Sequence, residues 1–170
     1  MPEIAMRNVI VVLSILAGCG AQDDAAKAKA FVDSYDRAMK QISAICRRVS
    51  LQVASGEPLR PEQRAALIIV YGRAAADVKL DDAPASLRAC RDGANDAFAK
   101  LRSATAEVSA KATEGASRDA IALANAAAPA VSDALRELRI AADNCKRDAQ
   151  KLDPPALAMS VPYFMVPRCI

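Results

Sequence analysis

The chain has 170 residues, of which 53% are hydrophobic, and it carries a formal net charge of +3. This charge is too small to indicate nucleic-acid binding, so we expect no nucleic-acid partner. The chain contains no histidine, which removes the commonest general base, the usual haem ligand and most zinc sites. We therefore expect no metal and no other cofactor, and we interpret the protein as a non-enzyme.

Residues 1–18 have the pattern of a secretory signal peptide. Arg7 supplies a positive charge, and Val9 to Leu16 form an apolar run that only Ser14 interrupts. This run is too short to cross a bilayer, for which about 20 apolar residues are needed. These residues are also compatible with an ordinary signal peptide that contains a cysteine by chance, or with a buried N-terminal helix.

The end of this segment is more specific. Leu16-Ala17-Gly18-Cys19 resembles the lipobox of bacterial lipoproteins, in which the cysteine is acylated, for example with palmitate, and becomes the first residue of the mature chain. The resemblance implies that Cys19 is lipidated, and two or more acyl chains make a stable anchor. In lipoproteins of enteric type, Asp after the cysteine retains the protein in the inner membrane. Gly20 occupies that position here, so the resemblance implies the outer membrane, with the protein facing the periplasm.

Residues 19–152 are predicted to form a helical domain rich in alanine, which has the highest helix propensity. After a short linker, Asp23 and Asp24 favour a helix start through capping and the helix dipole. An apolar stripe at alternating spacings of three and four follows, which predicts one buried face. Gly56 and Pro58 predict the end of this helix. The stripe consists of Phe31, Tyr35, Ala38, Ile42, Ile45 and Val49.

A second, shorter helix is predicted to begin at Pro61, because proline suits the first turn of a helix. Within it, the segment LIIVY (residues 67–71) is also compatible with a buried strand. The alanines and charges on both sides favour the helix. Asp81 and Asp82 close the segment and, with Pro84, open the third helix.

The two longest helices are predicted to come next and to form an antiparallel hairpin, with the turn near Gly115 and Ser117. Proline lacks a backbone N–H, so Pro129 predicts a kink or break in the fourth helix near residues 125–128. The predicted fold is all-α, an up-and-down bundle of about four helices. The apolar stripes are Leu87, Cys90, Ala94, Ala97, Leu101, Ala104 and Val108 in the third helix, and Ile121, Ala124, Ala128, Val131, Leu135, Leu138, Ala142 and Cys145 in the fourth.

Residues 153–170 form a different kind of segment, an apolar tail with several prolines that exclude a regular helix. We expect this tail to pack back on the bundle. The alternative is that the tail presents a hydrophobic surface to a partner, with Tyr163 and Phe164 in contact. The prolines are Pro154, Pro155, Pro162 and Pro167, and the large apolar residues are Val161, Tyr163, Phe164, Met165, Val166 and Ile170.

Four cysteines remain after Cys19, an even number that indicates two disulfides in an oxidising compartment such as the periplasm. With a rise of about 1.5 Å per residue, Cys90 and Cys145 lie at similar depth on facing helices. The tail is long enough for Cys169 to reach Cys46. We therefore predict the pairs Cys90–Cys145 and Cys46–Cys169, although four cysteines allow three pairings.

Basic residues gather at several points, including Arg136 with Arg139. Most such groups form solvated helix faces beside acids at helical spacing. The alternative is an electropositive surface for an acidic partner, with Arg136 and Arg139 in contact.

These features favour a non-catalytic lipoprotein that binds a protein partner. The first hypothesis is an immunity protein that inhibits a secreted antibacterial toxin or cell-wall hydrolase, because a preorganised inhibitor loses little entropy on binding. The second is an assembly factor that resembles pilotins, small helical lipoproteins that bind a segment of an outer-membrane secretin. A structural spacer of the envelope and an enzyme are the remaining alternatives.

Overall fold

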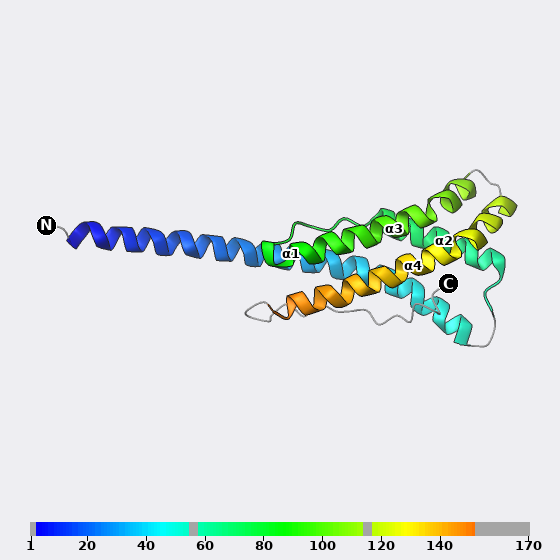
Figure 1. Cartoon of the computed structure of the whole chain (residues 1–170), viewed down its shortest axis with the longest axis horizontal. Helices are drawn as coiled ribbons and strands as arrows, with labels where there is room; N and C mark the ends of the chain where they lie inside the picture. The colour runs from blue at the N-terminus through cyan, green and yellow to red at the C-terminus, as the bar shows by residue number, and fades with distance from the viewer. Residues whose placement is uncertain (1–2, 55–57, 114–116, 152–170) are drawn as a thin grey trace.

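The computed structural model describes the backbone of residues 3–54, 58–113 and 117–151, and the side chains of residues 23–51, 58–113 and 118–151. Every regular element in these ranges is helical (Figure 1), which confirms the predicted all-α class with four packed helices. The elements are α1 (Glu3–Ala54), α2 (Pro61–Ala76), the short 3-10 helix η1 (Ala85–Leu87), α3 (Arg88–Thr113) and α4 (Ser117–Ala149).

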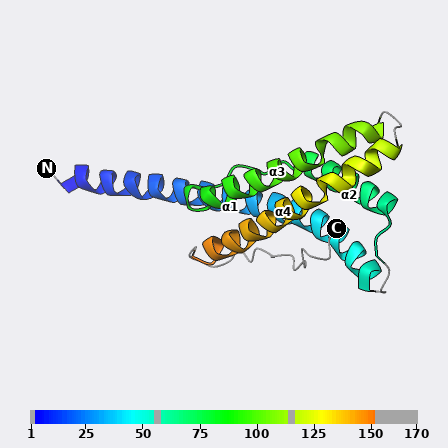
Figure 2. The same cartoon turned by 45° about the vertical axis from the view of Figure 1, so that its right-hand side comes forward.

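Successive α-helices run in opposite directions (Figures 1 and 2). The predicted antiparallel hairpin is formed by α3 and α4, which lie side by side and pack more extensively than any other pair. Helix α2 packs against both of them, and α1 packs against α2. The segment LIIVY lies inside α2, so its helical interpretation is confirmed, and Ile68 and Tyr71 are fully buried.

The predicted start of the first helix is wrong. Helix α1 begins at Glu3 and has 52 residues, so it is also longer than α3 and α4. Asp23 lies inside this helix, where its carboxylate forms an ion pair with Lys27 at 2.9 Å. No proline interrupts the sequence here, and alanine and lysine are good helix formers. A capping preference worth about 1 kcal/mol therefore does not end the preceding helix.

The predicted break in the fourth helix is also absent, because α4 continues through Pro129. The side chain of Pro129 is exposed, so its ring does not disturb the core. Ala124 and Val131, on either side of it, are both buried in the same hydrophobic core. Packing on both sides of the proline offsets the loss of one backbone hydrogen bond.

The apolar stripes of α1, α3 and α4 meet in the interior of the bundle. Most of the predicted stripe residues are buried, and the others, Ile45, Ala104, Ile121 and Ala128, are partly buried against the same core. Polar contacts also join neighbouring helices; Arg64 of α2, for example, donates a hydrogen bond to the side-chain oxygen of Asn125 of α4 at 3.1 Å. Arg102 of α3 donates a hydrogen bond to the Ala75 carbonyl at 3.1 Å, which satisfies an acceptor at the end of α2. Lys100 of α3 forms an ion pair with Glu137 of α4.

Several predicted features lie outside the described residues. These are the Cys19 side chain and the whole of the tail, with Tyr163, Phe164 and Cys169, so the predicted pair Cys46–Cys169 is among them. In the described part of the chain, no helix combines the length and the apolar character that crossing a membrane requires.

Candidate functional site

A disulfide joins α3 to α4 close to the start of one helix and the end of the other. Cys90 and Cys145 form this bond, as predicted, with their Cα atoms 4.8 Å apart. Both residues are buried, with exposed fractions of 3% and 0%. The bond therefore fixes the separation of the two helices at this end of the hairpin.

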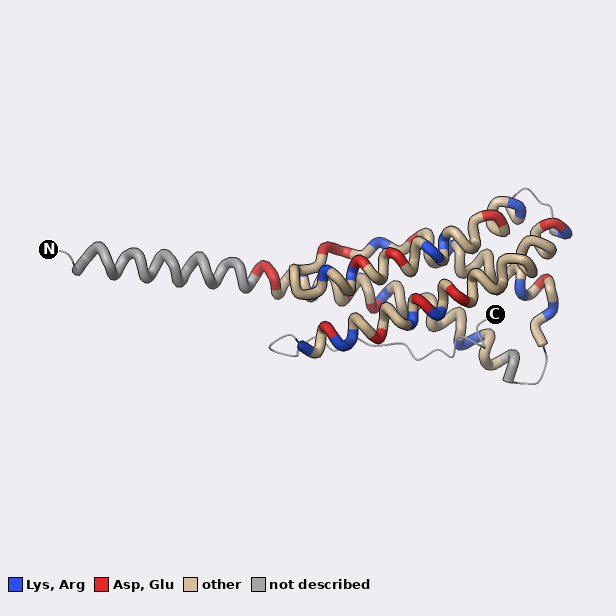
Figure 3. The backbone as a smooth tube through the Cα atoms, in the orientation of Figure 1, with Lys and Arg blue, Asp and Glu red and all other residues tan. Residues whose placement is uncertain are grey.

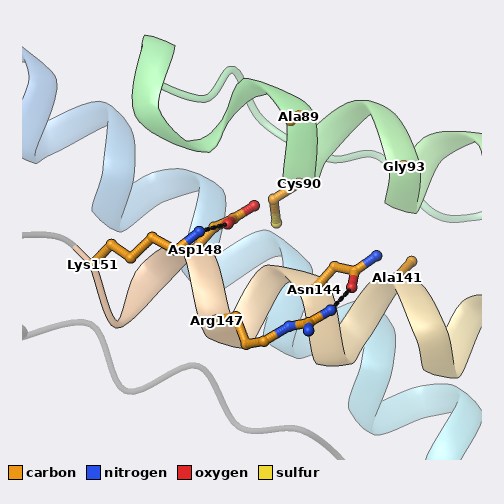
Figure 4. Close-up of a pocket in the computed structure, with 8 residues that line it drawn as sticks. All are labelled: Ala89, Cys90, Gly93, Ala141, Asn144, Arg147, Asp148 and Lys151. Carbon is orange, nitrogen blue, oxygen red and sulfur yellow. Dashed lines mark hydrogen bonds and ion pairs between the residues drawn. The ribbon is translucent and has the colours of Figure 1, made fainter.

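A groove lies between α3 and α4 beside this disulfide (Figure 4), with a volume of about 320 Å³. We call it the α3–α4 groove. Small residues at positions 89, 93 and 141 keep it wide, and its polar side chains come from the last turns of α4 and from Lys151 just after that helix. The lining residues are Ala89, Cys90, Gly93, Ala141, Asn144, Arg147, Asp148 and Lys151.

Gly93 keeps one wall of the groove open. A Cβ atom built at this position would have no heavy atom within 4 Å. Packing within the chain therefore does not require glycine here, although glycine inside a helix costs about 1 kcal/mol relative to alanine. Among the residues that the structure describes, none comes within 4 Å of this Cβ position.

Of the two basic side chains at the groove, one has a carboxylate partner and the other has a neutral one. The Lys151 ammonium lies 2.9 Å from the Asp148 carboxylate. Arg147 donates a hydrogen bond to the side-chain oxygen of Asn144, which is neutral. Figure 4 shows both interactions on the α4 side of the groove. Among the residues that the structure describes, Arg147 has no carboxylate partner, so its charge faces the groove without compensation.

The surface continues around α4 into a second, shallower hollow that also includes Asn144 and Arg147. Ile140 lines this hollow and is 54% exposed, which is unusual for a large apolar side chain in this bundle. An exposed isoleucine beside an arginine provides apolar and charged contacts within one small area.

A further hollow lies between α1 and the segment that joins α2 to η1, and it includes Ser34. The Ser34 hydroxyl donates to the Phe31 carbonyl at 2.9 Å and accepts from the Asp81 N–H at 3.0 Å. These bonds hold the connecting segment against α1. We therefore assign Ser34 a structural role.

The two arginines singled out from the sequence lie elsewhere on α4. Arg136 is exposed and forms an ion pair with Asp133 on the same helix. Arg139 is partly buried and also engaged in an interaction, and neither arginine lines the α3–α4 groove. Figure 3 shows positive and negative residues interspersed along the helices.

Gly93 and Arg147 were not singled out from the sequence as site residues, but the structure shows that both line the α3–α4 groove. Arg147 belongs to a basic pair with Lys146 that is visible in the sequence, but the spacing does not show that it faces a groove. An isolated glycine within a helical pattern was the available signal for position 93.

Within the described ranges, no three His, Cys, Asp or Glu residues are grouped so that they could hold a metal ion. The chain matches no protein-family model, no curated protein and no solved structure.

Proposed function

We propose that this protein is a non-catalytic lipoprotein of the bacterial periplasm, anchored to the outer membrane through Cys19, that binds and neutralises a secreted antibacterial toxin or cell-wall hydrolase. The lipobox, Leu16 to Cys19, supports the anchor and the location. The α3–α4 groove supports the binding role. The lipid anchor and the binding role can be tested separately.

The observation that carries the binding role is the open groove beside a disulfide. Cys90–Cys145 fixes the two helices that form its walls, so little conformational entropy is lost when a partner binds. Gly93 leaves space that no side chain of the described residues fills. A rigid surface of this kind suits an inhibitor that binds a toxin and blocks its activity.

The chemistry of the groove specifies the partner segment. A carboxylate of the partner would pair with Arg147, and a charge-assisted bond of this type is about twice as strong as a neutral one. A partner backbone or small side chain would lie over Gly93, and an apolar side chain would contact Ile140. We therefore expect a segment that carries an acidic residue close to an apolar one.

The experiment is a pull-down from native periplasm with residues 20–170, oxidised, as bait. Bound proteins are identified by mass spectrometry. Near-stoichiometric recovery of a secreted wall- or membrane-attacking protein, with loss of its activity in the complex, is the expected result. Recovery of a secretin instead would assign the protein to the second candidate, a pilotin-like assembly factor, because a groove between helices also fits a bound secretin segment.

Gly93→Leu tests the groove itself. A Cβ atom at this position has no described residue within 4 Å, so the leucine side chain is expected to occupy the open space, to leave the fold intact and to lower partner binding at least tenfold. Ala110→Leu is the matched control, since it adds a similar side chain to an exposed position of α3 away from the groove. Equal binding by both variants would place the partner on another surface.

The anchor is tested by growth with radioactive palmitate. Label is expected in the wild-type protein and absent from Cys19→Ser, which would also leave the membrane fraction. Label that persists in Cys19→Ser would mean that the lipid is attached elsewhere, and no label in the wild-type protein would remove the lipid anchor; neither result affects the groove.

A further inference from the structure

Residues 88–97 of α3, and residues 141–151 at the end of α4 and just after it, form the walls of the α3–α4 groove. The side chains that these walls bury are all small, whereas the hairpin buries several large ones farther along. Because burial stabilises in proportion to apolar area, apolar packing between α3 and α4 is weakest at the groove. The buried residues are Cys90, Ala94, Ala97, Ala142, Cys145 and Ala149 in the walls, and the larger ones farther along include Phe98, Leu101, Val108, Val131, Leu135 and Leu138.

Polar contacts do not replace this packing. In the described part of the chain, no hydrogen bond or ion pair joins one wall to the other, because the ion pairs there lie within one helix or reach the segment before α3. The next link between the two helices is the ion pair of Lys100 with Glu137, about 15 Å along α3 from Cys90. The Cys90–Cys145 bond is therefore the main connection between the described walls.

We propose that this disulfide is a redox switch, which a reductant reaches through the groove. In the disulfide form the walls are held together and the groove is present. In the dithiol form the walls separate, their backbone opens locally and the groove is lost. The rest of the bundle stays folded, because its large buried side chains do not depend on the bond. The effect on binding rests on the proposed function: the chain binds its partner in an oxidising compartment and not in a reducing one.

The groove gives a reductant access to one of the two sulfur atoms. Cys90 lines the groove, whereas Cys145 is fully buried, and Figure 4 shows the Cys90 side chain pointing from α3 towards α4. A thiolate of a reduced thiol oxidoreductase attacks the Cys90 sulfur, the S–S bond breaks, and Cys145 leaves as a thiolate that takes up a proton. The second thiol of the oxidoreductase then displaces Cys90, which also takes up a proton. Two electrons and two protons pass from the oxidoreductase, which becomes a disulfide.

Cys90→Ala/Cys145→Ala tests the switch, because it removes the bond, adds no buried polar group and leaves Cys46 in place. Amide hydrogen exchange of the full-length variant and of the oxidised wild-type protein is compared by mass spectrometry. We expect exchange to become about tenfold faster or more in the groove walls and to stay unchanged in residues 101–108 and 131–138. Unchanged exchange in the walls, or an equal increase in all of these segments, would overturn the proposal.

Gly93→Leu tests access in a chain that keeps the bond. The oxidised protein is incubated with dithiothreitol, quenched with N-ethylmaleimide and digested at lysine. Maleimide is then counted on peptides 80–100 and 112–146, which contain Cys90 and Cys145. A leucine beside Cys90 covers its sulfur, so we expect reduction to be about fivefold slower or more than in the wild-type protein.

Ala110→Leu is the matched control and should be reduced at the wild-type rate. Equal rates in all three proteins would mean that the reductant reaches the bond by another route, which would overturn the proposal. Neither measurement involves a binding partner. A negative result in either leaves the proposed function standing, and failure of the pull-down leaves the switch standing.

Discussion

Gly72 lies where α2 packs closely against α3. A Cβ atom at this position would stand 2.7 Å from Thr105 Oγ1 and 2.9 Å from Ser109 Oγ. Thr105 cannot easily move away, because it is buried and its hydroxyl donates to the Leu101 carbonyl at 2.9 Å. We therefore expect Gly72→Ala to lower the free energy of unfolding by about 1–3 kcal/mol, measured by urea denaturation.

Gly93→Ala is the matched control for this prediction. The same substitution meets nothing at this position, so we expect it to raise the free energy of unfolding by about 0.5–1 kcal/mol through helix propensity. If Gly72→Ala also raised the free energy of unfolding, helix propensity rather than close packing would govern position 72.

Tyr35 has a buried hydroxyl that forms no hydrogen bond with any residue that the structure describes. A buried polar group without a partner costs about 1–3 kcal/mol. Tyr35→Phe removes the hydroxyl and keeps the ring, which packs against Phe31 with a centroid distance of 6.0 Å. We expect the free energy of unfolding to stay equal or to rise by about 1 kcal/mol. A loss of more than that, measured by thermal and urea unfolding, would reveal a favourable contact of the hydroxyl.

At the scale of the elements, Pro129 weakens α4 at a surface position. It has no N–H to donate to the Asn125 carbonyl, and its own side chain is exposed. Proline inside a helix costs about 3 kcal/mol relative to alanine, although alanine loses more backbone entropy on folding. We expect Pro129→Ala to raise the free energy of unfolding by about 1–3 kcal/mol.

The control for this substitution is Ala130→Pro, at the next exposed position of α4. It should lower stability, because it adds a second proline without removing the first. Unchanged stability in Pro129→Ala would mean that α4 already satisfies the Asn125 carbonyl by other means.

The positions of helices were predicted correctly where many residues contribute to one apolar periodicity. The stripe from Phe31 to Val49 repeats over five turns, and burial of such a face outweighs local preferences, so the periodicity identified the packed side of α1. The start of that helix depended on Asp23 and Asp24 alone. Two capping residues are a weak signal when the residues before them can also be helical, and the prediction was wrong there.

At the scale of the whole molecule, the sequence allowed the Cys90–Cys145 pair to be predicted, because two regular helices joined by a short turn fix the depth of each residue. The α3–α4 groove could not be predicted in the same way. It depends on the separation of two helices and on the absence of a side chain at Gly93, and neither follows from hydrophobic periodicity. The orientation of Arg147 likewise depends on the rotation of α4 in the bundle.

The stability of the whole bundle should fall at alkaline pH, because two buried tyrosines ionise more readily in the unfolded chain than in the folded one. Burial raises the pKa of both Tyr35 and Tyr71 above the ordinary value of 10.0. Above pH 10 the unfolded chain loses these protons while the folded chain retains them, so unfolding releases protons and becomes more favourable as the pH rises. Each tyrosine should lower the free energy of unfolding by about 1.4 kcal/mol per pH unit.

Urea denaturation at pH 9, 10 and 11 measures this slope, and the double variant Tyr35→Phe/Tyr71→Phe isolates the tyrosine contribution. Below pH 10 both tyrosines are protonated in the folded and unfolded chains, so the difference in stability between wild type and variant should be constant there. Above pH 10 the wild type should lose stability faster than the variant, by up to about 2.7 kcal/mol per pH unit. Parallel profiles would mean that both hydroxyls ionise in the folded bundle as readily as in water, which is incompatible with their burial between the helices.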